Sequence, residues 1–481
     1  MRRNDQNKRR DKTVGDEIVQ EDKFSNLPDP PFYRILSFLE LDDIARVGGL
    51  SNRLKERCSF LTSFKIDPNM LEDRKRQSGY LHFLDKVLKS FRNREIKSLH
   101  IPWFPHEDGI HVNEWINNAA KRCKLGKLIV DHTLEKQDKI VLPCCEFLKV
   151  MKLTLYDGTL EFPTMGFATL QVLTLISVEI VCDGFGKLLS SCNSLTRLKL
   201  ENFSGVNKIE ITNSSLQVIS ILKTNSDDLD HLKISANALK IMNVAWYFRS
   251  STNKSFHLSA PSLESLTWRG DSIYHCDFVG NCKLLKDAYI NLRHPCMLTQ
   301  HLSTVDEALV HNSLWKLISS VREAQSLQLN CWQIEGLFSD RQPKSLDNLQ
   351  DLVLKVSDFN KDCQVPATVS LLMLLPNIRT LKIKCCRQPL GTNVSNVMAL
   401  EASSYEPGEW ISCLELVEIE LVGGGDEMQL VEYLLKCGKV LKKMTILYSI
   451  LDVHRLSELA SALRGFNKAS SQVAMFFLPY Y

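Results

Sequence analysis

Apolar residues recur along most of this chain in one short pattern of three. Two positions separate the first apolar residue from the second, and one position separates the second from the third. Copies of this Leu-x-x-Leu-x-Leu pattern, read as apolar at its three places, begin at Ile96, Leu125, Leu148, Leu170, Leu195, Leu216, Leu239, Leu263, Leu285, Leu349, Ile378, Leu414 and Leu441, with a weaker copy at Ala324. The alternation predicts a short strand with one buried face. Most copies begin 21–29 residues apart, so we expect stacked repeats that share one core.

This period is typical of leucine-rich repeats, and it predicts a curved solenoid with a parallel sheet on its inner face. An extra copy, Leu229-x-x-Leu232-x-Ile234, falls between the copies at Leu216 and Leu239. It is too close to both to be a full repeat. We interpret it as a strand on the outer wall of the solenoid.

A wider interval separates the copies at Leu285 and Ala324. The segment Thr304-Val305-Asp306-Glu307 within it is a candidate capping box. We expect an amphipathic helix after it, with apolar residues Leu309, Leu314, Leu317, Ile318 and Val321.

Residues between the core leucines should face outward from the sheet because side chains alternate along a strand. The outward set comprises Arg197, Lys199, His231, Lys233, Arg269, Asp287, Tyr289, Ser326, Gln328, Lys382 and Lys384. If Leu229 begins an outer strand, His231 and Lys233 leave this set. The remainder is mildly basic, which suits an acidic or phosphorylated segment; an ordinary solvated strand face explains it equally well. The candidate substrate-binding residues are Arg197, Lys199, Arg269, Tyr289, Lys382 and Lys384.

Trp246, Tyr247 and Phe248 extend one strand past its core positions. We interpret these aromatic residues as core or edge packing of the array rather than as a binding platform.

A short helical module is predicted ahead of the array. Asp29 is expected to cap its first helix, with Pro30 in the first helical position, where a missing N–H costs nothing. The apolar face of this helix contains Ile35, Leu36, Phe38 and Leu39.

Two further short helices complete this module. The second starts at Asp42 or Asp43, carries Ile44, Ala45 and Val47, and stops at Gly48-Gly49. Ser51 is expected to cap the third, which contains Leu54 and Cys58. Three helices in about 40 residues have too little core to bury all their apolar residues, which indicates a partner surface.

The pattern of predicted elements changes again after Gly408. Residues 414–421 predict a strand, the segment from Gly423 to Asp426 a hairpin-like connector, and residues 428–435 a helix capped by Asp426 and ended by Gly438. A second strand follows at 441–446. The glycines are not a phosphate-binding loop, because no Lys-Ser or Lys-Thr follows them.

Composition narrows the class of protein. The 481 residues carry a formal net charge of +3, which argues for no particular nucleic-acid or membrane partner. Fifteen cysteines without a Cys-x-x-Cys are interpreted as buried thiols; His275-Cys276 with Cys282 comes closest to a metal cluster but lacks zinc spacing.

The start of the chain has no signal-peptide pattern, and we expect the protein in the nucleus, the cytoplasm or both. The basic residues of 1–22 suit a disordered tail or a nuclear-import signal.

The N-terminal module resembles the F-box. The matching residues are Leu27-Pro28-Asp29, Ile35-Leu36-Ser37-Phe38-Leu39, Asp43, Ala45-Arg46 and Leu50-Ser51-Asn52-Arg53. Pro30-Pro31 replaces the usual apolar pair, and Leu54 stands where the family commonly has Trp. Both departures are expected to shrink the contact area and weaken partner binding. The alternative is a helical cap on the open end of the array.

The C-terminal module resembles the FBD domain of plant F-box proteins, through residues 416–419, 432–435 and 440–446 and the segment 467–471 with its following apolar strand. The expected fold is therefore α/β, a leucine-rich-repeat solenoid with a small N-terminal three-helix F-box and a C-terminal strand–helix–strand FBD module. The predicted boundaries are a disordered basic tail at 1–22, an F-box at 23–65, leucine-rich repeats at 66–405 and an FBD-like domain at 406–481.

The resemblance implies a non-catalytic substrate receptor of a Skp–cullin–F-box ubiquitin ligase. The F-box would dock a Skp-type adaptor and cullin complex, the repeats would hold an unknown protein substrate, and no cofactor, nucleic acid or membrane is implied. The adaptor-binding residues would be Leu27, Pro28, Ile35, Leu36, Phe38, Leu39, Ile44, Val47, Leu50 and Leu54.

Three other functions compete with this one. A non-ligase interaction scaffold follows if the divergent F-box no longer binds the adaptor. A hormone co-receptor needs a small-molecule pocket that the sequence does not indicate. An enzyme is disfavoured because the sequence has no Gly-x-Ser-x-Gly, metal triad or nucleotide loop.

Overall fold

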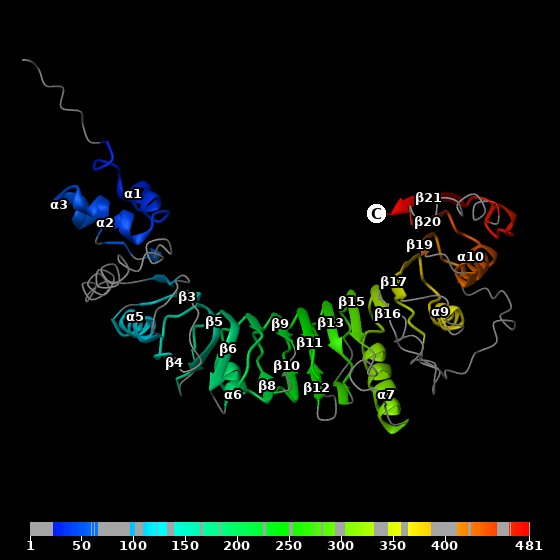
Figure 1. Ribbon diagram of the computed structural model, residues 1–481, viewed down its shortest axis with the longest axis horizontal. Helices are drawn as coiled ribbons and strands as arrows, with labels where there is room; N and C mark the ends of the chain where they lie inside the picture. Colours follow the sequence, from blue (N-terminus) through cyan, green and yellow to red (C-terminus); the bar gives the residue numbers. More distant parts are fainter. Residues whose placement is uncertain are drawn as a thin grey trace, which may run out of the picture.

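The computed structural model describes residues 23–58, 60–61, 63–65, 97–101, 109–122, 124–131, 139–163, 167–181, 184–224, 228–249, 254–273, 275–279, 282–293, 304–330, 345–356, 364–385, 411–421, 425–449, 461 and 463–480. Their strands stack side by side along an arc whose two ends rise toward the same side (Figure 1). The predicted tail at 1–22 lies outside the described residues.

The described strands of the main sheet number 17, and their pairings are parallel. They follow one another in chain order, except that β4 (Lys139–Val141) pairs with the second half of β5. The others are β1 (Ser63–Lys65), β2 (Ser98–Ile101), β3 (Lys127–Asp131), β5 (Val150–Glu161), β6 (Val172–Val181), β7 (Arg197–Glu201), β9 (Val218–Lys223), β11 (Ile241–Trp246), β13 (Ser265–Asp271), β15 (Asp287–Arg293), β16 (Ser326–Asn330), β17 (Asp351–Val356), β18 (Thr380–Cys385), β19 (Leu416–Leu421), β20 (Lys443–Ser449) and β21 (Ala474–Tyr480).

Every predicted repeat copy forms a strand of this sheet, so the predicted leucine-rich-repeat solenoid is confirmed. Burial alternates along the strands as the pattern requires: Leu198 and Leu200 of β7 are buried, whereas Arg197 and Lys199 are exposed. The buried side chains face the outer layer, and the others line the concave side of the arc.

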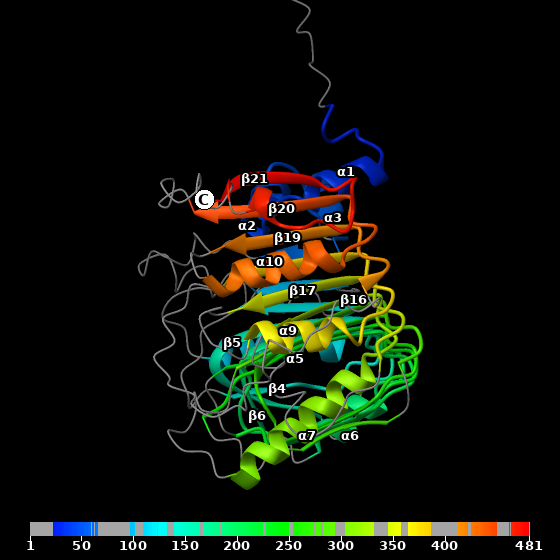
Figure 2. The ribbon, with the colours of Figure 1, turned by 90° about the vertical axis from the view of Figure 1, so that its right-hand side faces the viewer.

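The outer layer is a second sheet over part of the array and helices over the rest. The described part of this second sheet has four parallel strands: β8 (Lys208–Thr212), β10 (His231–Ser235), β12 (Ser255–Ser259) and β14 (His275–Phe278). The helices are α5 (Gly109–Arg122), α6 (Phe185–Ser191), α7 (Thr304–Ser320), α9 (Gln364–Leu372) and α10 (Gly425–Cys437). Figure 2 shows α7, α9 and α10 along the outside of the strands.

The length of each repeat decides which outer element forms. Copies from Leu195 to Leu285 begin 21–24 residues apart, and this short return path is filled by an extended outer strand. The wider interval after Leu285 accommodates α7, as expected. Between the layers, the rings of Phe256 and Trp268 pack edge to face with centroids 4.3 Å apart.

The extra copy at Leu229 is confirmed as an outer strand, because β10 belongs to the second sheet. His231 and Lys233 therefore leave the inner face. The prediction for Trp246 and Phe248 is also confirmed, since both are buried.

The predicted strand–helix–strand is confirmed, and the hairpin-like connector predicted from Gly423 to Asp426 falls only partly within the described residues. Helix α10 begins at Gly425, and β19 and β20 pair in parallel, so the connection is a crossover. Asp426 lies inside α10 rather than before it, whereas Gly438 does follow its last residue. Gly423 and Gly424 lie outside the described residues.

The C-terminal strands continue the array without a break. Strand β19 pairs with β18 in parallel, and β20 and β21 extend the same sheet. The boundary at 405–406 stays a prediction. No helix among the described residues has the length and apolar character needed to cross a membrane.

Among the described residues, three short helices precede the array: α1 (Asp29–Leu36), α2 (Leu41–Gly49) and α3 (Asn52–Cys58). Ser51 caps α3 as predicted, because its Oγ accepts a hydrogen bond from the Leu54 N–H at 3.1 Å. Asp29 does not cap α1: it is the first helical residue and follows Pro28 in the cap position.

Candidate protein-binding sites

The three N-terminal helices share a small core, which we call the docking-module core. Its buried side chains are Phe32, Leu36, Ile44, Leu54, Cys58 and Leu61. Three predicted adaptor-binding residues, Leu36, Ile44 and Leu54, are thus internal to the module. The expected loss of contact area at Leu54 does not apply, because its side chain is 3% exposed and packs inward.

Arg57 fastens α3 to the segment that leads into α1. Its guanidinium donates to the carbonyl oxygens of Ser25 at 2.9 Å and Leu27 at 2.8 Å, and it pairs with Asp29 at 3.0 Å. It also lies 3.7 Å from the centroid of the Phe32 ring. One side chain therefore fixes the start of the module.

Large apolar side chains remain exposed on this module. Phe38 is 78% exposed, Leu50 75% and Ile35 42%, and all three were predicted to bind the adaptor. Phe60, 59% exposed, was not predicted, because it follows the last predicted helix. Several large exposed apolar residues on one small module indicate a partner surface.

The other predicted adaptor-binding residues are less accessible or peripheral. Leu27, Leu39 and Val47 are partly buried against the core, and Pro28 is exposed. The structure brings all ten residues into one module, and their binding role stays a prediction. A hollow of about 540 Å³ opens beside it, lined by Leu27, Pro28, Asp29, Tyr33, Arg53, Glu56, Arg57 and Phe60.

The six predicted substrate-binding residues all lie on strands of the main sheet but form two groups. Arg197 and Lys199 are on β7, and Lys199 pairs with Glu201 at 2.7 Å. The other four lie on β13, β15 and β18. Strands β9 and β11 separate the two groups, so the six do not make one site.

Within the second group, the structure brings Arg269 and Tyr289 into contact. The Arg269 guanidinium lies 5.3 Å and the Lys355 ammonium 5.4 Å from the Tyr289 ring centroid. The Tyr289 hydroxyl accepts hydrogen bonds from Asn291 at 3.0 Å and from Lys355 at 3.3 Å. The ring thus connects residues of three strands.

Sequence reasoning missed Asn291, Asn330 and Lys355. The signal was present: each follows the third apolar residue of its copy, the same place that Arg269 and Lys384 occupy. The Asn330 side-chain amide donates to the Asn291 side-chain oxygen at 2.5 Å. A comparison of equal positions across copies would have found the three residues.

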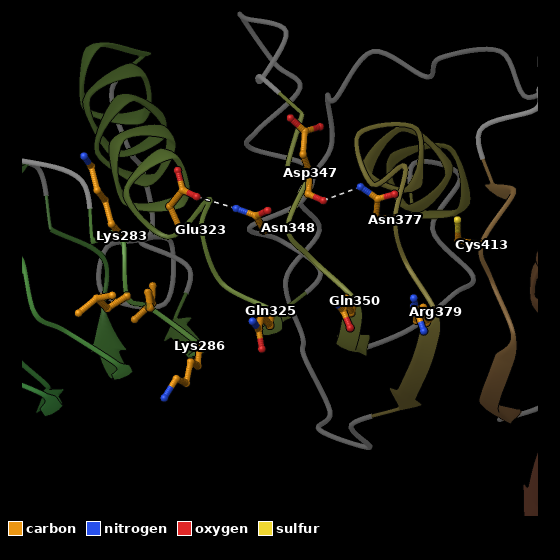
Figure 3. Close-up of a pocket in the computed structure, with 12 residues that line it drawn as sticks. Lys283, Lys286, Glu323, Gln325, Asp347, Asn348, Gln350, Asn377, Arg379 and Cys413 are labelled. Carbon is orange, nitrogen blue, oxygen red and sulfur yellow. Dashed lines mark hydrogen bonds between the residues drawn. The ribbon is translucent and has the colours of Figure 1, made fainter.

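A second hollow, of about 530 Å³, lies at the N-terminal ends of strands β15 to β19 (Figure 3). Asn348 points at Glu323 and donates to its carboxylate at 2.6 Å, while Asn377 donates to the Asp347 carbonyl at 2.7 Å. Both signs of charge line it: Lys283, Lys286, Arg379, Glu323 and Asp347. We interpret these bonds as links between neighbouring coils.

Several of the described cysteines are buried as the sequence analysis expects, whereas Cys144 is exposed. Cys276 and Cys282 are buried, and burial raises the pKa of both thiols. Among the described residues, no three His, Cys, Asp or Glu side chains are grouped to hold a metal.

Comparisons with known proteins agree with this architecture. Residues 112–268, from α5 to β13, match the family described as FBD-associated F-box protein At5g56370, LRR repeats, and residues 407–446 match the FBD family. The second match covers β19, α10 and the start of β20.

Relatives from Arabidopsis thaliana extend along most of the chain. The putative F-box/FBD/LRR-repeat protein At4g03220 is 26% identical over 96% of both chains. The F-box/FBD/LRR-repeat protein At5g53840 is 22% identical over 94% of both, and the F-box/LRR-repeat protein At3g58900 is 27% identical over 66% of this chain and 96% of its own. The predicted resemblance is confirmed: this chain is a homologue of plant F-box/FBD/LRR-repeat proteins.

Proposed function

We propose that this chain is the substrate-recognition subunit of a Skp–cullin–F-box ubiquitin ligase. The observation that carries the proposal is the exposed apolar surface of Ile35, Phe38 and Leu50 on a three-helix module at one end of a long array. The relatives' names, which include F-box, support the same assignment.

The proposed division of labour needs no catalytic residue on this chain. The module docks a Skp-type adaptor, and the array holds a protein substrate near a ubiquitin-loaded enzyme. Holding two reactants together raises their effective concentration, which accelerates transfer without bond chemistry on the receptor.

Adaptor capture tests the proposal. Burial of a Phe or Leu side chain is worth about 1.5–3 kcal/mol, so Phe38→Asp with Leu50→Asp should weaken capture of a plant Skp-type adaptor at least about 100-fold. Because both side chains are exposed, the thermal midpoint should not change. Leu284→Asp, at a residue 56% exposed on the array, is the matched control.

Undiminished capture by the double variant would rule out this docking face. Failure of the unmodified, folded chain to capture the adaptor would favour a non-ligase scaffold. Leu36→Ala gives an internal check: because Leu36 is buried, it should reduce capture only together with faster proteolysis of residues 23–65.

A further inference from the structure

Five residues form one line across five neighbouring strands of the concave side. We call it the inner-face row: Arg269, Asn291, Asn330, Lys355 and Lys384. Register places Arg269 beside Asn291, Asn330 beside Lys355, and Lys355 beside Lys384. The bond between Asn291 and Asn330 joins the two halves. At about 4.8 Å per strand, the row is about 19 Å long.

The inner-face row carries positive charge without a matching carboxylate. Among the described residues, no acidic group lies within ion-pair distance of Arg269, Lys355 or Lys384, whereas some other lysines of the same face are paired. Lys199 meets Glu201 at 2.7 Å, and Lys382 meets Glu418 at 3.8 Å. The row therefore adds three positive charges to one stretch of a chain whose formal net charge is only +3.

Tyr289 contacts three of the five residues of the row, Arg269, Asn291 and Lys355. Arg269 approaches the Tyr289 ring from the neighbouring strand β13, and Lys355 approaches it from β17, two strands away on the other side. The Tyr289 hydroxyl accepts hydrogen bonds from Lys355 and Asn291. Cations at the ring leave little room to stack a base, which disfavours a single-stranded nucleic acid. A lysine ammonium has three N–H groups, so Lys355 keeps donors for a partner.

We propose that the inner-face row binds an extended acidic protein segment through its Asp or Glu carboxylates. About six residues of extended chain span 19 Å. The cations lie on separate strands with amides between them, which suits a segment that carries several separate single negative charges. Phosphate recognition favours clustered arginines, and the row has one. This proposal rests on the proposed function, because it names the class of substrate segment that the array would hold.

Fluorescence anisotropy with the purified full-length chain tests the proposal. The probe is a fluorescein-labelled decapeptide of alternating Glu and Gly. Lys355→Gln with Lys384→Gln should weaken its binding about tenfold. The matched control, Lys127→Gln with Lys152→Gln, removes two exposed charges from β3 and β5 of the same face and should leave affinity within about twofold.

Three outcomes would overturn the proposal: equal binding of a Gln-Gly decapeptide, equal losses in both double variants, or no saturable binding. Tighter binding of a phosphoserine decapeptide would assign the row to phosphate instead, and tighter binding of a 12-mer oligothymidylate would assign it to nucleic acid. Lys355→Arg with Lys384→Arg should retain binding.

Adaptor capture separates this proposal from the proposed function. The Lys355 and Lys384 variants should capture the adaptor normally, while the Phe38 and Leu50 variants should bind the acidic peptide normally. Loss of peptide binding together with intact capture would then concern the row alone.

Discussion

The Arg293 guanidinium donates to both carboxylate oxygens of Asp271, at 2.6 and 2.7 Å, across paired strands β13 and β15. Asp271 is fully buried and also accepts the Phe248 N–H at 2.8 Å. Arg293 continues over the Tyr247 ring at 4.9 Å. The buried Asp271 carboxylate therefore connects three successive coils, at the point where the chain leaves the main sheet for the outer layer.

We expect Arg293→Ala to destabilise this region by about 2 kcal/mol. Loss of one partner from a buried pair costs about 3–5 kcal/mol, and the 45% exposed Arg293 side chain reduces that cost through solvent screening. Hydrogen exchange of the Phe248 amide and the thermal midpoint measure the effect.

Lys286→Ala is the matched control, because it removes an exposed ion pair to Glu264. Such pairs contribute about 0–1 kcal/mol. If both substitutions change the hydrogen exchange of the Phe248 amide equally, the hydrogen bond from this amide to Asp271 does not depend on Arg293.

Arg57 should decide whether the docking module stays folded. Arg57→Ala removes two hydrogen bonds to carbonyls and the contact with Phe32, for which we expect a loss of about 2–3 kcal/mol. Adaptor capture should fall, while hydrogen exchange in the repeats should not change. Arg57→Lys should restore only part of the stability, because lysine lacks the planar guanidinium fork that donates to both carbonyls.

Arg53→Ala provides the control for this effect. Arg53 is exposed and donates one hydrogen bond to Asn26 at 2.9 Å. We expect a cost below about 1 kcal/mol and normal capture. Proteolysis of residues 23–65 that is equally fast in both variants would contradict the role of Arg57.

The inner sheet could be predicted because its signal repeats. Each copy has the same three apolar places, and side chains alternate along a strand, so residues such as Leu198 and Lys199 are assigned to opposite faces from the letters alone. The outer strands carry weaker signals: Ile209 and Ile211 of β8 are only two apolar residues in a short interval. The one outer strand predicted, β10, was the one that repeats the full pattern.

The candidate sites depend on relations that single letters do not contain. In the docking module, Leu36 is buried and Phe38 is exposed although both belong to one apolar run, because a three-helix core accommodates only part of that run. On the concave side, Lys355 and Lys384 become neighbours only once the register of β17 and β18 is fixed.

Gly270 should tolerate no side chain. Its φ is +126°, and a Cβ there would lie 1.9 Å from the Trp246 carbonyl oxygen. Gly270→Ala combines backbone strain of about 1–3 kcal/mol with a clash against fixed backbone, so we expect at least about 3 kcal/mol of destabilisation and a clearly lower thermal midpoint. Gly465→Ala, where nothing lies within 4 Å of the added carbon, should change stability by less than about 1 kcal/mol. Equal midpoints would show that the strand can shift to admit a methyl group.

Adjacent cysteines should differ sharply in reactivity. Cys144 is exposed and Cys145 is buried. Burial is the main cause that raises the pKa of the Cys145 thiol from 9.0 to about 11, with a smaller contribution from Cys144. The reactive form is the thiolate, and a shift from 9 to 11 lowers its fraction at pH 8 about 100-fold. Iodoacetamide at pH 8 should therefore label Cys144 much faster than Cys145.

The same shift predicts how stability depends on pH. The raised pKa means that the folded state favours the neutral Cys145 thiol, so its contribution is complete below pH 9 and is lost as the pH rises toward 11. Labelling of Cys145 should accelerate over this range, and a denaturant should remove the difference between the two thiols at pH 8. Peptide mass spectrometry resolves them after Cys144→Ser and Cys145→Ser are labelled separately. Equal rates in the two folded variants at pH 8 would show that the Cys145 thiol is accessible.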